Sequence, residues 1–311
     1  MRVAVSNARS RQGLAQLRAL IGAHHQPVAL TRSPAPFTQA DLAGVGMRAA
    51  DNFDPASLSR ALEGTDALFF QMPLLEHPDR LRQFAHNVAA AAGRAGLTRV
   101  ILNSTMWSPD TRCGQPTYDL VREIEEIFEA TDLPLTIFRP TVFMDNWITS
   151  YARPALIHDH LYRYPHKPQL RFSPISLDDL ARFMVAALPR NDLIGQRFRV
   201  AGPQTLSPAD VRSALSAAMG VEIAYQYVSP MDFAEDTFER FVKQTGADRA
   251  AYVAAFDNFY RFNNDAPEQP FLFDVAPVRA QIDVPLETFA QWAARQNWFD
   301  DDGEGIGSIS G

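Results

Sequence analysis

The sequence has 311 residues, with a hydrophobic content of 46% and a charged content of 21%, values typical of a globular protein with a sizeable core. Its formal net charge of -7 argues against broad binding to nucleic acids or anionic membranes, since either would require a basic face. The single cysteine, Cys113, excludes an internal disulfide and a cysteine metal cluster. It is interpreted as an incidental loop residue, with a catalytic thiol as the alternative.

In the first half of the chain, short apolar runs alternate with helical patterns, which is typical of a parallel sheet covered by helices on both faces. The predicted strands are 3–5, 27–30, 67–70, 100–103 and 135–138. The predicted helices begin near Gly13, Pro55, Pro78 and Pro116. Proline is well suited to a helix start, because the N–H it lacks has no intrahelical partner there.

Beyond Pro140 the pattern is looser. Segments 161–164 and 170–173 flank a turn at 166–169, which predicts a hairpin. The later predicted elements are a helix at 177–188, a strand at 197–200, a helix at 207–219 with Ser207 as its N-cap, a strand at 224–228 and a helical, aromatic-rich segment at 231–262.

These elements predict an α/β fold with a doubly wound, Rossmann-like parallel sheet. Residues 1–150 are expected to form the dinucleotide-binding domain. Residues 151–300 are expected to form a smaller C-terminal α+β substrate region that is interleaved with the main sheet. The small, acidic, glycine-rich segment 301–311 is predicted to be a disordered tail.

The first strand, turn and helix have the pattern of a dinucleotide-binding fingerprint that has lost most of its glycines. In the G-x-x-G-x-x-G form of this turn, the three glycines allow a sharp bend, close approach to the pyrophosphate and close helix packing. Here the three positions hold Asn7, Ser10 and Gly13. Because asparagine tolerates left-handed geometry and serine is small, the turn is expected to survive with weaker phosphate binding. Arg9 and Arg11 are either pyrophosphate ligands or solvated turn residues.

Six sequence blocks in order resemble the NmrA-like family of atypical short-chain dehydrogenases/reductases, over roughly residues 2–233. The blocks are VALTRSP (28–34), ADNFDPASLSRALEGTDALFF (50–70), NVAAAAGRAGLTRVILNST (87–105), LPLTIFRPTVFMDNW (133–147), ISLDDLARFMVAAL (175–188) and AGPQTLSPADV (201–211). The resemblance implies a Rossmann-like fold with a cleft of cofactor size.

The resemblance also implies a set of cofactor-binding positions. Arg32 falls where this family often holds the adenosine 2′-phosphate, which favours NADP(H) as the cofactor; the alternative is an ordinary surface arginine. The other implied positions are Asp51, Asn52 and Phe53 along the adenine, Gln71, Met72 and Pro73 near the nicotinamide ribose, and Phe143 facing the nicotinamide or the substrate. Loop, strand-end and core-packing roles are the structural alternatives for these residues.

The catalytic pattern of short-chain dehydrogenases is incomplete. These enzymes use a serine or threonine to hold the substrate oxygen, a tyrosine as general acid and a lysine four residues later. Ser104 or Thr105 stands in the first position, but the usual tyrosine and lysine positions hold a threonine and a valine. Tyr118 and Arg122 have the same spacing one step along the helix, so this pair is a candidate replacement, although arginine does not relay protons as lysine does.

The segment after residue 150 is expected to shape the substrate cleft. If His158, Asp159 and His160 lie on a strand, both imidazoles point the same way and have the spacing of zinc ligands. No third ligand lies at short spacing, which favours substrate binding by the two histidines over a metal site. Trp147 and Tyr162 are candidates for an aromatic wall of the same cleft or for core packing.

The favoured function is that of an NADP(H)-dependent oxidoreductase acting on a small organic carbonyl or alkene. Two alternatives stay open: a non-catalytic regulator that senses the dinucleotide, and a lyase, isomerase or cyclase that needs no cofactor. A small-molecule substrate is expected, together with a homodimer or a regulatory protein as a further partner. No nucleic-acid or membrane partner is expected. The absence of a leader and of an apolar run of membrane length predicts a cytoplasmic location.

Overall fold

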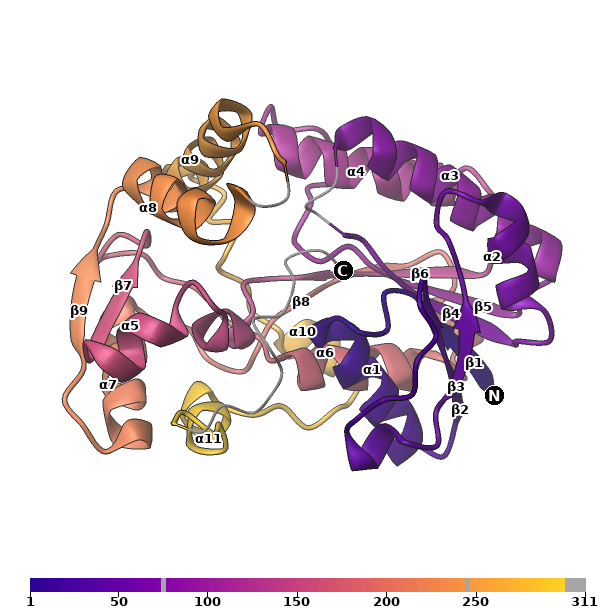
Figure 1. Ribbon diagram of the computed structural model, residues 1–311, viewed down its shortest axis with the longest axis horizontal. Coiled ribbons are helices and arrows are strands. Elements are labelled where there is room, and N and C mark those ends of the chain that lie inside the picture. The colour runs from indigo at the N-terminus through magenta and orange to yellow at the C-terminus, as the bar shows by residue number, and fades with distance from the viewer. Residues whose placement is uncertain (74–76, 244–245, 300–311) are drawn as a thin grey trace.

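The computed structural model describes residues 1–73, 77–243 and 246–299, and its centre is a seven-stranded parallel sheet (Figure 1). The strand order is β3-β2-β1-β4-β5-β6-β8. The strands are β1 (Arg2–Val5), β2 (Gln26–Thr31), β3 (Gly46–Ala49), β4 (Ala67–Gln71), β5 (Arg99–Asn103), β6 (Leu135–Pro140) and β8 (Arg197–Val200). This arrangement confirms the predicted Rossmann-like fold class.

Helices cover both faces of the sheet. One face carries α1 (Arg11–Gly22), α6 (Leu177–Ala187) and α10 (Ala276–Arg279), and the opposite face carries α2 (Pro55–Leu62), α3 (Pro78–Ala95) and α4 (Pro116–Glu129) (Figure 1). Because side chains alternate along a strand, neighbouring residues of β4 pack on opposite faces of the sheet. Phe69 packs in the core beneath α1 and α6, and Phe70 packs in the core beneath α2, α3 and α4. Proline occupies the first turn of α2, α3 and α4, as predicted.

A smaller region packs at one end of the main sheet around its own core, centred on Trp147 and Trp292 (Figure 1). Its elements are η2 (Met144–Ile148), α5 (Arg153–His158), β7 (Leu161–Tyr164), α7 (Pro208–Met219), β9 (Ala224–Tyr227), α8 (Pro230–Thr237), a π-helical turn (Phe238–Val242), α9 (Arg249–Asp265) and α11 (Phe289–Ala294). Ser207 caps α7 through a capping box with Asp210, as the sequence predicts. Both α6 and β8 return to the main sheet, so the chain passes between the two regions more than once.

The predicted hairpin is wrong. β7 pairs in parallel with β9, which lies far along the chain, and segment 170–173 contributes only an isolated bridge between Phe172 and Leu206. Tyr162 and Tyr164 of β7 are buried in the core of the smaller region. The strand partner of β7 is therefore determined by tertiary packing rather than by a local turn. The predicted tail, 301–311, lies outside the described residues. No helix in the described ranges is long and apolar enough to cross a membrane.

Candidate functional site

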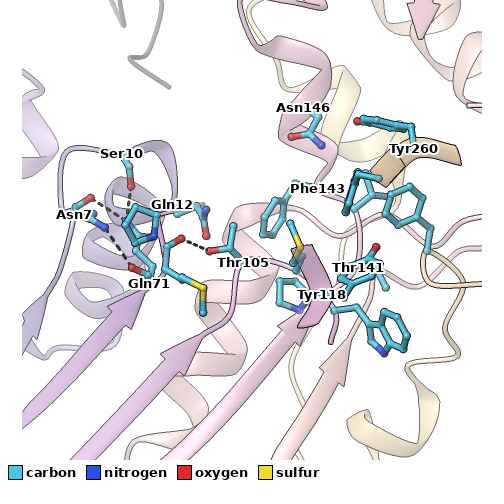
Figure 2. Close-up of a pocket in the computed structure, with 18 of the residues that line it drawn as sticks. Asn7, Ser10, Gln12, Gln71, Thr105, Tyr118, Thr141, Phe143, Asn146 and Tyr260 are labelled. Carbon is cyan, nitrogen blue, oxygen red and sulfur yellow. Dashed lines mark hydrogen bonds between the residues drawn. The ribbon is translucent and has the colours of Figure 1, made fainter. Parts of the chain in front are cut away.

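A cavity of about 380 Å³ lies at the carboxyl ends of β1, β4, β5 and β6. In a doubly wound sheet, ligands bind at this edge, where the strand order reverses. Figure 2 shows the side chains of the turn after β1 on one side of the cavity and aromatic side chains on the other. The lining residues are Asn7, Ser10, Gln12, Gln71, Met72, Pro73, Thr105, Met106, Trp107, Tyr118, Pro140, Thr141, Val142, Phe143, Asn146, Tyr151, Phe259, Tyr260 and Phe271.

The glycine-poor turn makes a left-handed bend at Asn7 and packs closely against Gly13 of α1. Asn7 adopts the left-handed conformation with φ of 47°, as its tolerance for this region predicts. A Cβ on Gly13 would lie 2.5 Å from the Asn7 carbonyl oxygen and 2.6 Å from the Ala8 Cα, so only glycine fits at this position. Ser10 is the N-cap of α1, and its Oγ accepts a hydrogen bond from the Gly13 N–H at 3.1 Å.

The turn presents free hydrogen-bond donors to the cavity. The backbone N–H groups of Arg11 and Gln12, in the first turn of α1, have no acceptor within the described part of the chain. These groups carry the positive end of the helix dipole, which favours an anion. Since Ser10 and Gln12 line the cavity, the turn fits a diphosphate.

The three arginines near the turn differ in their contacts. Arg9 donates to the carbonyl of Ala35 and stacks over Phe37, with its Cζ 5.0 Å from the ring centroid. Arg11 donates to the carbonyl of Ile148 at 3.1 Å, which ties the turn to η2. Arg32, directly after β2, is exposed and has no hydrogen bond or ion pair with any described residue. Of the three arginines predicted to bind phosphate groups, only Arg32 has no hydrogen-bond or ion-pair partner among the described residues.

The predicted adenine segment lies after β3, beside the end of β2, and does not line the cavity. Asp51 accepts a hydrogen bond from the Phe53 N–H at 2.9 Å, and the Asn52 carbonyl accepts one from Asn87 Nδ2 at 3.0 Å. These contacts fix the loop on the same edge of the sheet as Arg32. Adenine binding by this segment stays a prediction.

Of the two candidate substrate-oxygen ligands, only Thr105 reaches the cavity. Ser104 is fully buried, with its hydroxyl 2.7 Å from the Met106 carbonyl oxygen and 3.0 Å from that of Phe138. Thr105 lines the cavity, but its hydroxyl donates to the carbonyl of Met72 at 2.8 Å. The proton of each hydroxyl is therefore held by the backbone.

Tyr118 lies at the cavity wall, and its hydroxyl is also committed. It donates to Asn263 Oδ1 at 2.5 Å, and Asn263 Nδ2 donates to the Phe259 carbonyl at 2.8 Å. Because that carbonyl only accepts, the amide orientation is fixed and Tyr118 must be the donor. Burial raises the pKa of the Tyr118 phenol well above its usual value, an effect partly offset by the bond to Asn263 and by the charge of Arg199.

The predicted pair of Tyr118 and Arg122 is not assembled. The Arg122 guanidinium lies 3.2 Å from Glu125 and 2.7 Å from Glu129, both on its own helix, and does not line the cavity. The cation that acts on Tyr118 is instead Arg199 of β8, which stacks over Trp107. Asn263 and Arg199 were missed from the sequence because both reach Tyr118 from distant elements without a motif.

The aromatic side of the cavity carries no charge. Its rings come from Tyr118, Phe143, Tyr151, Phe259, Tyr260 and Phe271, and no described Asp, Glu, Lys, Arg or His lines the cavity. Phe143 lines the cavity, and its contact with the nicotinamide or the substrate stays a prediction. Trp147 and Tyr162 do not line the cavity; both are buried in the neighbouring core.

The predicted substrate-binding histidines lie elsewhere. His158 is the last residue of α5, His160 has a φ of 51°, and both are exposed. The segment is therefore not a strand, so the two imidazoles do not share a face. In the described ranges, no group of three or more His, Cys, Asp or Glu residues is placed to hold a metal ion.

The fold and the cavity at the carboxyl edge of the sheet are of the Rossmann type. A model of the NmrA-like family matches residues 1–283, and the chain belongs to this family. The chain is 30% identical over 200 residues to the NAD(P)H azoreductase of Xenophilus azovorans. That match covers 63% of this chain and 66% of the azoreductase, so the chain spans just under two thirds of this relative.

Two solved structures share the fold over nearly the whole chain. One is the NADPH-dependent quinone oxidoreductase of Escherichia coli in complex with NADPH, with a TM-score of 0.72 and 19% identity over 94% of this chain and 98% of that one. The other is NmrA, a negative transcriptional regulator, in complex with NADP, with a TM-score of 0.74 and 16% identity over 99% of this chain and 98% of that one.

Proposed function

We propose that the protein is an NADP(H)-dependent oxidoreductase whose substrates are neutral, planar, conjugated carbonyl compounds. One observation carries the proposal: a single cavity joins a turn with free N–H donors to an aromatic wall that has no charged side chain. The first feature suits an anionic dinucleotide and the second an uncharged aromatic substrate.

The residues that would hold the dinucleotide follow from their placement. The turn from Asn7 to Gly13 would bind the diphosphate, and Arg32 the 2′-phosphate of NADP(H). Gln71 and Met72, at the end of β4, would lie beside the nicotinamide ribose. When bound, NADPH supplies the hydride for the reduction.

The state of the hydroxyl groups favours conjugated acceptors over simple ketones. The protons of Thr105 and Tyr118 are held by the Met72 carbonyl and by Asn263, so neither is directed at a substrate oxygen. A substrate that gains negative charge must then stabilise it on its own conjugated framework and take its proton from solvent. The side-chain amides of Gln12 and Asn146 line the cavity and supply hydrogen bonds to a carbonyl oxygen. The names of two relatives, an azoreductase and a quinone oxidoreductase, indicate conjugated acceptors, an azo compound in one case and a quinone in the other.

A dinucleotide-sensing regulator is the second candidate. It is favoured by the same absence of a directed acid, since sensing requires binding without turnover. The similarity to the regulator NmrA in complex with NADP adds to it.

The test has two steps on the purified full-length chain. NADPH affinity is first measured by calorimetry, and NADPH oxidation is then followed with a neutral naphthoquinone and with its sulfonated derivative as the anionic comparison. We expect NADPH binding and turnover of the neutral quinone, with kcat/KM at least about tenfold lower for the sulfonate, because a desolvated anion finds no cation at the aromatic wall. Binding without turnover of any quinone would favour the regulator, and absence of NADPH binding would refute both.

A further inference from the structure

Gln71 fills the space beneath the glycine-poor turn. It is the last residue of β4, is 2% exposed, and extends its side chain under the turn that follows β1 (Figure 2). Its Nε2 donates to the Asn7 carbonyl at 2.9 Å and to Ser10 Oγ at 2.5 Å. Since the Asn7 carbonyl only accepts, the amide orientation is fixed, which agrees with Gln71 Oε1 accepting from Gln16 Nε2 at 3.2 Å.

This arrangement decides what Ser10 does with its proton. A hydroxyl group accepts two hydrogen bonds and donates one. Ser10 Oγ already accepts from Gln71 Nε2 and, at 3.1 Å, from the Gly13 N–H. Its own O–H must therefore act as a donor, and none of the described residues accepts from it. Ser10 lines the cavity, so its proton is available to a ligand there.

We propose that Gln71 is a positioning residue that makes Ser10 a hydrogen-bond donor to the diphosphate of the dinucleotide. The inference rests on the proposed NADP(H) binding. In the glycine-rich turn, the small residue lets backbone N–H groups approach the phosphates. Here the serine side chain interposes a donor of its own, and Gln71 prevents that hydroxyl from turning its lone pairs toward the phosphate.

The test is a double-substitution cycle on NADPH affinity. The variants are Ser10→Ala, Gln71→Met, which keeps length without a donor, and the two combined. Each single variant is expected to weaken NADPH binding by about tenfold, the loss of one hydrogen bond to a charged group. The combined variant is expected to bind NADPH no more weakly than the single variant with the lower affinity, because Gln71 acts through Ser10.

Two further substitutions keep the test decisive if Gln71→Met does not fold. Ser10→Thr keeps a hydroxyl at the N-cap and is expected to bind NADPH within about threefold of the wild type. Gln71→Glu places a carboxylate that accepts the Ser10 proton, so we expect a loss at least as large as that of Ser10→Ala. Ser213→Ala, which removes a hydroxyl bonded only within α7, is the matched control. Apo melting temperatures are measured for all variants, since a purely structural role would lower these without changing affinity.

The inference is overturned if both Gln71 variants bind NADPH as tightly as the wild type, or if the losses of Ser10→Ala and Gln71→Met add in the combined variant. A wild-type chain that does not bind NADPH gives a different result, which removes the proposed function itself. Losses that do not add, together with recovery in Ser10→Thr, support the inference.

Discussion

The two sides of the cavity are built in different ways. The turn side consists of Asn7, Ser10, Gln12 and Gln71, which come from the turn after β1, the start of α1 and the end of β4, and its donors are either free or aligned by neighbouring side chains. The aromatic side brings together residues from α4, the segment after β6, α9 and the segment beyond it. Its rings carry no charge, and the hydroxyl of Tyr118 is satisfied within the protein. The proposed cofactor site is thus built mainly from one contiguous turn, whereas the proposed substrate wall depends on tertiary packing.

The two sides also differ in how they accommodate lost motif residues. On the turn side, the missing glycines are replaced by a left-handed asparagine and by a serine held by Gln71. On the aromatic side, Arg122 does not replace the missing lysine, because glutamates on its own helix bind it. The comparison therefore predicts strong effects from residues proposed to bind the anionic cofactor and weak effects from Tyr118.

The largest effect is expected from Arg32→Ala. Arg32 is exposed and free of protein partners in the described part of the chain, so its substitution should not disturb the fold. Loss of a guanidinium bound to a phosphate weakens NADPH binding by about 10- to 100-fold, while NADH binding stays within about twofold. Calorimetric titration with both nucleotides measures the ratio. Arg112→Ala removes another exposed arginine, one paired with Glu126, and serves as the control. Equal losses for the two nucleotides would show that Arg32 does not contact the 2′-phosphate.

The sequence predicts the turn side better than the aromatic side for a physical reason. Strand, turn and helix at residues 2–22 are encoded by contiguous residues, and the left-handed geometry at Asn7 follows from its residue type. The partner of Tyr118 is Asn263, which lies on α9 and is brought near only by packing of the smaller region. Likewise, the pairing of β7 with β9 replaces a hairpin that local turn chemistry favours. Contacts between distant segments leave no periodic signal in the chain.

A smaller effect is expected from Tyr118→Phe. Because the phenol proton is held by Asn263, its removal should lower kcat for a neutral quinone by no more than about threefold, if the proposed function holds. Leaving Asn263 Oδ1 buried and unpaired should lower the free energy of unfolding by about 1–2 kcal/mol, as measured by urea denaturation. The opposite pattern, a kcat loss of about 100-fold with unchanged stability, would identify Tyr118 as the general acid. It would contradict the view that the aromatic side supplies no proton to the substrate.

The smallest effect on ligand binding is expected in a region that belongs to neither side of the cavity. Asp179, near the start of α6, is fully buried, accepts a hydrogen bond from the Glu287 N–H at 3.0 Å and pairs with Arg182. Burial raises the pKa of its carboxyl from 3.8 to about 7. The folded state therefore holds this proton up to about pH 7, whereas the unfolded chain releases it near pH 4, so stability falls as pH rises between these values. In the wild type, the free energy of unfolding is therefore expected to be lower at pH 8 than at pH 4. Asp179→Asn should reduce this difference between the two pH values by about 1–3 kcal/mol. Asp178→Asn, at the partly exposed neighbour paired with Arg295, is the matched control. NADPH affinity at fixed pH should be unchanged in both variants, because neither residue lines the cavity. A pH slope identical to that of the wild type would mean that Asp179 is ionised in the folded protein and is stabilised by Arg182 throughout.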